Sequence, residues 1–383
     1  MKIVYVLGGN YAPNGMSCVL TQKINWLAVN TDYDIYVVLT ERPDLPMYYP
    51  VHESVKCVNF NIGFDELDTM PLLRKLYAFK RKQSHYKTSF TEYLMHLRPD
   101  IVVCTVRREL SFINNIPDGS KKIGEIHFPK SHYREFKNRL FPSFINRLIT
   151  RYWQTAMIDE IKRLSAFTVL SETDREEWTE LDYVNVINNP LSVFPKSVVE
   201  CNSKHVIAVG RYSWEKGYDM LFEAWKQVSV LFPDWHLDIY GPGDRELYAK
   251  MVVDMGLNTQ ITCHPADSHI FDRYSEAEFL VLSSRYEGFG LVIAEAMSCG
   301  RPTVCFDCPS GPRSIVNDSV DGLLAEKDNP KDLADKICWM IENDEKRKLM
   351  GYNARESARR FSEDVIMPQW VNLFERVIGG VGY

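Results

Sequence analysis

Short apolar runs alternate with helical stretches along this chain, and the alternation starts again near its middle. Ile3–Leu7 and Ile35–Leu39 are such runs in the first half, and His205–Val209 and His236–Tyr240 are their counterparts in the second. The run at Ile3–Leu7 lacks polar alternation, which is typical of a parallel strand covered on both faces. Strands separated by helices predict an α/β fold with parallel sheets and crossover helices.

The length of 383 residues favours two domains over a single core. A polar, proline-punctuated segment at 188–204 marks the boundary between them. We therefore expect two Rossmann-like, doubly wound domains, at residues 1–190 and 191–362. The amphipathic last segment, 363–383, follows the final strand–helix unit, and we expect it to cross back onto the first domain.

Composition narrows the range of partners and compartments. The net charge of −6 argues against a nucleic-acid partner. Nine scattered cysteines suit a reducing compartment better than a disulfide framework. The first apolar run is too short for a leader peptide, and no run approaches the ~20 residues of a membrane span. These features predict a cytoplasmic location. Cys305 and Cys308 could form half of a zinc site, but no second ligand pair stands at suitable spacing, so we expect no metal.

The segment 283–296 is the most informative about chemistry. A strand ends at Leu282, a glycine-containing loop follows, and a helix begins near Gly290. The N–H groups at a helix start favour a phosphate, and Gly288 and Gly290 would let the backbone approach it closely. Glu295 lies among apolar helix residues, where an unpaired carboxylate is costly. A pair of sugar or ribose hydroxyls would satisfy it by donating two hydrogen bonds.

A second segment, 210–217, also joins a strand end to a helix. Ligands of open α/β sheets bind at the carboxyl ends of the strands. Arg211 and Lys216 should therefore point toward the same edge as the helix that begins at Gly290. Two cations there can neutralise a diphosphate, on which negative charge builds as a bond to it breaks.

Together with Gly241-Pro242-Gly243, these segments resemble the retaining glycosyltransferases of family 4. The family's paired glutamates match Glu287 and Glu295, and its Arg…Lys phosphate pair matches Arg211 and Lys216. The resemblance covers nearly all of the region from 205 to 345 and implies the GT-B fold, with two Rossmann-like domains facing each other across a cleft. It implies that the domain at residues 1–190 binds the acceptor and that the domain at residues 191–362 binds the nucleotide-sugar.

The resemblance also implies roles for these residues. Glu295 should hold the donor's ribose, Glu287 the transferred sugar, and Arg211 and Lys216 the diphosphate. The expected donor-binding backbone comprises Gly15, Gly241, Gly288, Phe289, Gly290 and Leu291. His127, at the end of a strand expected over 122–127, matches a histidine that faces the reacting sugar, although a structural histidine is the alternative. The glycine loop of the family aligns with Asn14-Gly15, and Gly8-Gly9 stands earlier in the chain.

The function implied is transfer of a hexose or N-acetylhexosamine, with retention, from a UDP-sugar to a saccharide or lipid-linked saccharide in polysaccharide or lipopolysaccharide biosynthesis. The segment 308–312 resembles members that build bacterial surface polysaccharides. We expect neither a metal nor another cofactor. A nucleotide-sugar epimerase or phosphorylase of the same fold and a non-catalytic sugar-nucleotide-binding subunit remain alternatives. A dehydrogenase is disfavoured because no G-x-G-x-x-G is complete.

Two predicted helices, over 72–97 and 133–164, are strongly basic. A solvated basic face is the simplest interpretation. The alternative is peripheral contact with the anionic inner face of the cytoplasmic membrane, which would suit a lipid-linked acceptor. The basic and aromatic residues concerned are Lys75, Lys80, Arg81, Lys82 and Lys87 in the first helix, and Lys130, Arg134, Phe136, Lys137, Arg139, Phe141, Phe144, Arg147, Arg151, Tyr152 and Trp153 in or beside the second.

Overall fold

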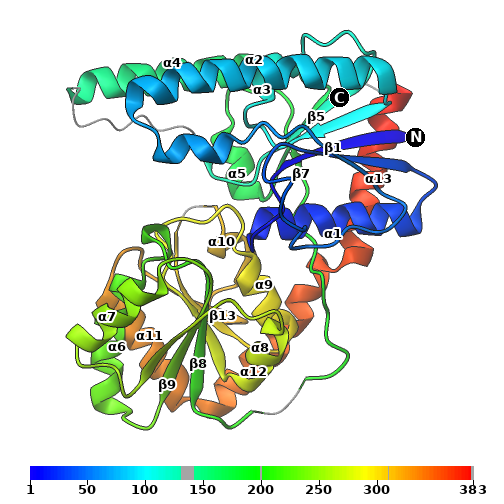
Figure 1. The fold of residues 1–383 in the computed structure, drawn as a ribbon. Helices are drawn as coiled ribbons and strands as arrows, with labels where there is room; N and C mark the ends of the chain where they lie inside the picture. Colours follow the sequence, from blue (N-terminus) through cyan, green and yellow to red (C-terminus); the bar gives the residue numbers. More distant parts are fainter. Residues whose placement is uncertain (131–141, 199–200, 309, 381–383) are drawn as a thin grey trace. The chain divides into compact units, whose positions relative to one another are not determined.

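The computed structural model describes residues 1–130, 142–198, 201–308 and 310–380 (Figure 1). The chain divides into two compact units. Unit 1 comprises Met1–Pro190 and Met367–Tyr383, and unit 2 comprises Leu191–Ile366. The final helix, α13 (Glu363–Gly379), contributes residues to both units.

Unit 1 is built on a seven-stranded, all-parallel sheet in the order β3-β2-β1-β4-β5-β6-β7. Ile3 of the central strand pairs with Ile35 on one side and Ile101 on the other. The strands are β1 (Lys2–Gly8), β2 (Asp34–Leu39), β3 (Lys56–Asn59), β4 (Ile101–Cys104), β5 (Lys121–Glu125), β6 (Ala166–Val169) and β7 (Asn185–Val186).

Helices cover both faces of this sheet, because right-handed crossovers in opposite directions along the strand order lie on opposite faces. One face carries α1 and α13, where Lys23 contacts Trp370. The other carries α2, α3 and α4, which are joined by hydrogen bonds from Gln83 to Ser111 and from Asn114 to Glu160. The helices are α1 (Gly15–Asn30), η1 (Phe64–Thr69), α2 (Leu72–Leu97), α3 (Leu110–Ile113), α4 (Ser143–Ile161) and α5 (Glu172–Glu177).

The core of unit 1 lies between the sheet and these helices. Tyr86, Phe90 and Phe112 form an aromatic cluster under α2, with ring centroids 5.2 to 6.3 Å apart. Each is almost fully buried, so the cluster removes a large apolar area from water.

Unit 2 repeats the design with a six-stranded parallel sheet in the order β10-β9-β8-β11-β12-β13. The order reverses beside β8, at the switch point where α/β sheets bind ligands. Val206 of β8 pairs with Leu237 on one side and Phe279 on the other. The strands are β8 (His205–Val209), β9 (His236–Tyr240), β10 (Ile261–His264), β11 (Phe279–Leu282), β12 (Thr303–Phe306) and β13 (Gly322–Ala325).

Helix α9 (Leu291–Ser298), which is labelled in Figure 1, is the element of unit 2 that matters most for the site. It begins directly after the loop that follows β11. The core beneath the helices contains Phe222, Trp225 and Ile337, all fully buried. The helices are η3 (Trp214–Lys216), α6 (Tyr218–Leu231), α7 (Arg245–Asp254), α8 (Ile270–Glu276), α9 (Leu291–Ser298), α10 (Pro312–Ile315), α11 (Pro330–Glu342), α12 (Asp344–Ala358) and η4 (Arg359–Phe361).

Two expected elements differ from those observed. The strand expected to reach His127 ends at Glu125, so His127 lies just beyond it. The helix expected over 133–164 is observed as α4, Ser143–Ile161. The basic and aromatic residues Arg134, Phe136, Lys137, Arg139 and Phe141 lie outside the described residues.

Candidate functional site

Hydrogen bonds join the loop after β8 to the loop after β11. The backbone N–H of Arg285 donates to the carbonyl of Glu215 (2.9 Å), and its guanidinium donates to the carbonyl of Trp214 (2.6 Å). The hydroxyl of Ser283 donates to the carbonyl of Lys216 (2.9 Å). The two loops that carry most of the predicted site therefore form one continuous wall at the carboxyl edge of the sheet.

Glycines allow these loops to approach closely. Gly217 has a left-handed φ of 63°, and a Cβ there would lie 2.1 Å from the carbonyl oxygen of Ser283. At Gly241 a Cβ would lie 1.9 Å from the carbonyl oxygen of Gly210. Side chains at either position would push neighbouring strand ends apart. Gly241 thus has a packing role that does not depend on a ligand.

Lys216 and Glu287 form an ion pair across the joined loops. Lys216 Nζ lies 2.6 Å from Glu287 Oε1, and Ser284 donates a hydrogen bond to the same oxygen (2.6 Å). The side chains of Lys216 and Glu287 are 15% and 12% exposed. The structure therefore brings together a residue predicted to hold phosphate and one predicted to hold the sugar.

Arg211 lies on the same loop but points into solvent, with 60% of its side chain exposed. It pairs with Glu215 at 2.7 Å. Arg211, Lys216, Glu215 and Glu287 together carry no net formal charge. A diphosphate would therefore have to exchange with these carboxylates, whereas none of the described side chains caps the start of α9, which carries a partial positive charge.

The start of α9 is shaped by Gly290, whose φ of 90° only glycine adopts easily. Among the described residues no side chain caps the helix, and the N–H of Ile293 donates to the carbonyl of Gly290 (2.9 Å), so the N–H groups of Leu291 and Val292 are the ones that a ligand could receive. Phe289 is buried and packs edge-on against Phe361, with centroids 5.4 Å apart. Its backbone, together with those of Gly288 and Leu291, is the part that a ligand could contact.

Glu295 lies one turn into α9 and is held from α8. Tyr274 donates a hydrogen bond to Oε2 (2.8 Å). Among the residues that the structure describes, Oε1 has no hydrogen-bond partner. Burial raises the pKa of Glu295 to about 7, against the lowering effect of the Tyr274 hydrogen bond. The carboxylate can therefore accept further hydrogen bonds, and these would favour its ionised form over its protonated form.

His127 belongs to unit 1, where it adjoins a buried ion pair. Its Nε2 lies 3.0 Å from Glu125 Oε1, and both Glu125 oxygens lie 2.6 Å from Lys23 Nζ. The side chains of Lys23 and Glu125 are each 1% exposed, and Lys23 Nζ lies 3.4 Å from the centre of the Trp370 ring. The imidazole thus lies beside a carboxylate whose charge Lys23 compensates, but its buried Nε2 makes no hydrogen bond to a described residue.

Gly15 also belongs to unit 1, as the first residue of α1. The side chain of Asn14 caps this helix by accepting from the N–H of Ser17 (2.8 Å). A Cβ at Gly15 would meet nothing within 4 Å, so packing does not explain a glycine there. The roles expected for Gly15 and His127 remain predictions.

Over residues 1–130, 142–198, 201–308 and 310–380, no three His, Cys, Asp or Glu side chains come together as metal ligands. In the same ranges, no helix combines the length and apolar character needed to cross a bilayer.

Residues 193–357, which contain this site, match the family model for glycosyl transferases group 1. One relative is the N,N'-diacetylbacillosaminyl-diphospho-undecaprenol alpha-1,3-N-acetylgalactosaminyltransferase of Campylobacter jejuni, 34% identical over 46% of this chain and 46% of that protein. Another is the poly(ribitol-phosphate) alpha-N-acetylglucosaminyltransferase of Staphylococcus aureus, 29% identical over 57% of this chain and 45% of that protein. The match spans less than half the length of each of these two relatives.

Solved structures resemble nearly the whole chain. Sucrose-phosphate synthase from Thermosynechococcus elongatus superimposes with a TM-score of 0.79 at 18% identity, covering 99% of both chains. Anabaena HepE in complex with UDP and glucose gives a TM-score of 0.69 at 17% identity, covering 98% of this chain and 99% of that one. This chain has the GT-B fold.

Several residues that position the site in unit 2 were not predicted from the sequence. Tyr274 holds Glu295, and Ser284 holds Glu287. Arg285 anchors its loop through a two-point pair with Asp219, at 2.9 and 2.6 Å. Arg285 lies in the segment 283–296, so its sequence position could have indicated a role. Tyr274 and Asp219 lie in helices whose sequences contain no motif that would indicate a functional residue.

Proposed function

We propose that this chain is a retaining glycosyltransferase that moves a hexose or N-acetylhexosamine from a UDP-sugar to a saccharide or lipid-linked saccharide. The observation that carries the proposal is the joined pair of loops in unit 2, which sets Lys216 against Glu287 beside the uncapped start of α9. The family match over this region supports transfer of a sugar. Three features of the similar proteins support the donor and acceptor classes. Two relatives are named as transferases of acetamido sugars, one of them has a lipid carrier in its name, and HepE binds UDP.

Donor binding follows from the geometry of unit 2. The start of α9 would receive the diphosphate through its free N–H groups. Arg211 and Lys216 would exchange their carboxylate partners for phosphate oxygens. The ribose hydroxyls would donate to Glu295, and Glu287, once released from Lys216, would accept from the transferred sugar.

In the reaction proposed, the bond between the anomeric carbon and the phosphate oxygen breaks as the acceptor hydroxyl attacks from the same face. The acceptor's proton passes to the departing phosphate, so UDP leaves and no enzyme group is altered. Lys216, Arg211 and the helix start would stabilise the growing negative charge. His127, which lies beside Glu125, would orient the sugar. No divalent cation is needed, so a chelator should leave transfer unchanged.

The helices α2 and α4 offer a surface for an anionic membrane. On α4 the side chains of Phe144, Leu148 and Tyr152 follow one another at single turns and are 56%, 62% and 72% exposed. Arg147 and Arg151 lie between them and are exposed. An apolar stripe edged with arginine suits the boundary between lipid headgroups and acyl chains. This would place the enzyme at the inner face of the cytoplasmic membrane, and failure to sediment with phosphatidylglycerol vesicles at low salt would contradict it.

The function is tested by screening UDP-sugars and acceptors with the wild type, Glu287→Ala and Arg211→Ala, and with Glu223→Ala on α6 as a surface control. Removing a group that stabilises the transition state costs about 10²–10³-fold in kcat. We expect losses of that order in the first two variants and none in the control. Full transfer by both site variants would refute these roles. A new sugar nucleotide formed from donor alone would identify an epimerase, and tight UDP binding without turnover would identify a binding subunit.

A further inference from the structure

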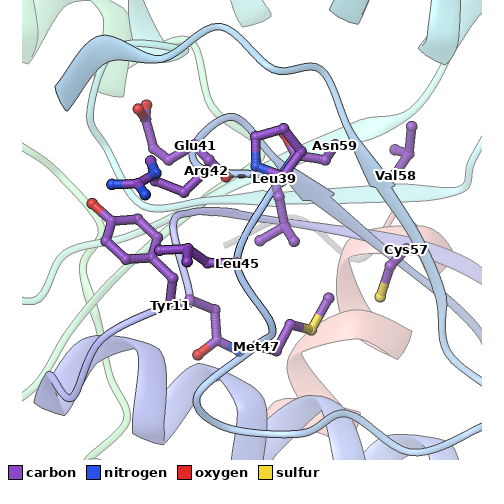
Figure 2. Close-up of a pocket in the computed structure, with 11 residues that line it drawn as sticks. Tyr11, Leu39, Glu41, Arg42, Leu45, Met47, Cys57, Val58 and Asn59 are labelled. Carbon is purple, nitrogen blue, oxygen red and sulfur yellow. Dashed lines mark hydrogen bonds between the residues drawn. The ribbon is translucent and has the colours of Figure 1, made fainter. Parts of the chain in front are cut away.

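Unit 1 contains a cavity of about 180 Å³ where β1, β2 and β3 end (Figure 2). Its polar and apolar side chains are interspersed, since Figure 2 shows Leu45 beside Tyr11 and Asn59 beside Val58. This lining does not select one chemical class of ligand. A feature with a more definite chemistry lies in unit 2, in the loop after β8.

Trp214 is the first residue of η3 in that loop, and 63% of its surface is exposed. The other aromatic residues of the segment, Tyr212 and Tyr218, are 4% and 3% exposed. An exposed indole leaves a large apolar area in contact with water. Packing in the core of unit 2 therefore does not explain a tryptophan at this position.

Arg285 holds the ring of Trp214 in place. The guanidinium carbon lies 4.6 Å from the centre of the ring, and the same guanidinium donates to the carbonyl of Trp214 (2.6 Å). Asp219 fixes the guanidinium through two further hydrogen bonds, of 2.9 and 2.6 Å. A planar guanidinium stacks on one face of an aromatic ring. The exposed area of the indole therefore lies on its other face and its edges.

This pair of Trp214 and Arg285 adjoins the pair of Lys216 and Glu287. Trp214 lies two residues before Lys216 in one loop, and Arg285 lies two residues before Glu287 in the other. A backbone hydrogen bond joins the loops between the two pairs. The indole thus lies near the proposed place of the transferred sugar, whereas the ribose and its base are assigned to Glu295 on α9.

Hydrogen-bonding groups border the ring. Asp219 has 44% of its side chain exposed although it binds Arg285, so its carboxylate can also accept from a ligand. Glu215 pairs with Arg211, and it would be released when Arg211 turns to the diphosphate. A pyranose fits such a surface, because its C–H groups contact the negative face of the indole while its hydroxyls donate to the carboxylates. A lipid chain would need apolar neighbours in place of these ion pairs.

We propose that the exposed face of Trp214 stacks on a pyranose of the acceptor saccharide, next to the sugar that is glycosylated. The proposal rests on the glycosyltransferase function and adds a contact from unit 2 that determines which acceptors are used. Lys216 and Glu287 would be occupied by the donor, so the ring beside them is left for the acceptor. An acceptor of two or more sugars would gain from this contact, and a monosaccharide would not.

Binding to the ring can be measured without turnover, by fluorine NMR of the full chain labelled with fluorotryptophan. The chain has eight tryptophans, and the signal of Trp214 is the one that Trp214→Tyr lacks. Maltotriose, cellotriose and tri-N-acetylchitotriose are titrated with UDP present, beside glucose and N-acetylglucosamine. At least one trisaccharide should shift this signal with an affinity about threefold or more above that of its monosaccharide. No shift with any trisaccharide, equal affinity for the monosaccharide, or a response to UDP alone would overturn the proposal.

Substitution of Trp214 tests its part in transfer. Trp214→Ala should raise the KM for an oligosaccharide acceptor by about two- to tenfold, with the affinity for UDP unchanged, because one aromatic contact is lost. Trp214→Tyr keeps an aromatic face and should recover most of the acceptor affinity, which a merely structural role would not predict. Tyr352→Ala removes an equally exposed ring from α12 and is the control.

The two measurements separate this proposal from the function on which it rests. A trisaccharide that binds at Trp214 without transfer of any sugar would retain the saccharide contact and reject the proposed function. Transfer with an unchanged acceptor KM in Trp214→Ala would reject the contact alone.

Discussion

At the scale of single residues, Glu295 links the protonation state of the site to its ligand. Burial raises its pKa to about 7 in the empty protein, whereas a carboxylate that accepts ribose hydroxyls is favoured in its charged form. Donor binding should therefore lower this pKa and release a proton near neutral pH.

We predict that UDP affinity falls about tenfold for each pH unit below 7 in the wild type, beyond the change caused by the nucleotide's own titration. Glu295→Gln, which cannot titrate, should bind UDP more weakly and lose this additional dependence. Calorimetric titrations from pH 5 to 8, in buffers of different ionisation enthalpy, measure both the affinity and the proton release. The same pH profile in wild type and variant would show that Glu295 does not touch the ribose.

The buried pair of Lys23 and Glu125 should matter for stability. Removing one partner of such a pair leaves an uncompensated charge, which typically costs about 3–5 kcal/mol. Lys23→Met should therefore lower the free energy of unfolding by that order, and the double variant Lys23→Met/Glu125→Gln should recover part of the loss. Denaturant unfolding followed by tryptophan fluorescence gives both values. Equal stability of the single and double variants would contradict the account.

The pH dependence of this pair has a definite sign. The pKa of Glu125 falls to about 2, because the charges of Lys23 and His127 outweigh the opposing effect of burial. Because this pKa is lower in the folded state than in the unfolded state, it stabilises the folded state fully at pH values above the ordinary carboxyl pKa of 4.5. That stabilisation is lost as the pH falls toward 2.

The residue scale also marks the limit of what could be predicted from sequence. The composition of α9 indicates that Glu295 needs a partner, but the hydroxyl of Tyr274 could not be identified, since the helix that carries it has no distinctive pattern. The pairing of Lys216 with Glu287 joins positions 71 apart in the chain, and only the fold brings them together.

At the scale of elements, the site depends on two loops that touch through glycine. We predict that Gly217→Ala weakens UDP binding by at least about tenfold and lowers the melting temperature, because the new methyl group would collide with the Ser283 carbonyl. Gly256→Ala is a matched control: its φ of 73° is also left-handed, but a Cβ there meets nothing within 4 Å. The control should lose only about 1 kcal/mol and bind UDP normally. Equal binding by both variants would mean that loop contact does not shape the site.

Elements with strong patterns were predictable. Helix α2 and the strands β8 and β9 begin and end at the residues that their sequence patterns indicate. Edge strand β3, by contrast, has only four residues and no continuous apolar run, so its sequence does not single it out. The end of β5 before His127 was misjudged because Ile126 is buried without belonging to the strand.

At the scale of the whole molecule, the strand–helix alternation begins again near the middle of the chain, and this was enough to predict two α/β domains. With the motif resemblance, it also predicted the GT-B fold. The two units differ in what their sequences disclose. Unit 2 carries its site on two compact segments that motif spacing identifies. The residues that line the cavity of unit 1 come from three separate strand ends, including that of β3, which was not predicted. No local sequence pattern identifies this cavity.

The central claim is that the joined loops of unit 2 bind the diphosphate of a sugar nucleotide, and the most direct test is the dissociation constant of UDP for Lys216→Met. The reference variant is Lys226→Met, which removes an exposed lysine from α6. A charge-assisted hydrogen bond contributes about 1.5–3 kcal/mol, so calorimetry should show UDP binding weakened by about 10- to 100-fold at Lys216 and unchanged at Lys226. If both variants bind UDP as tightly as the wild type, the nucleotide does not bind where this account places it.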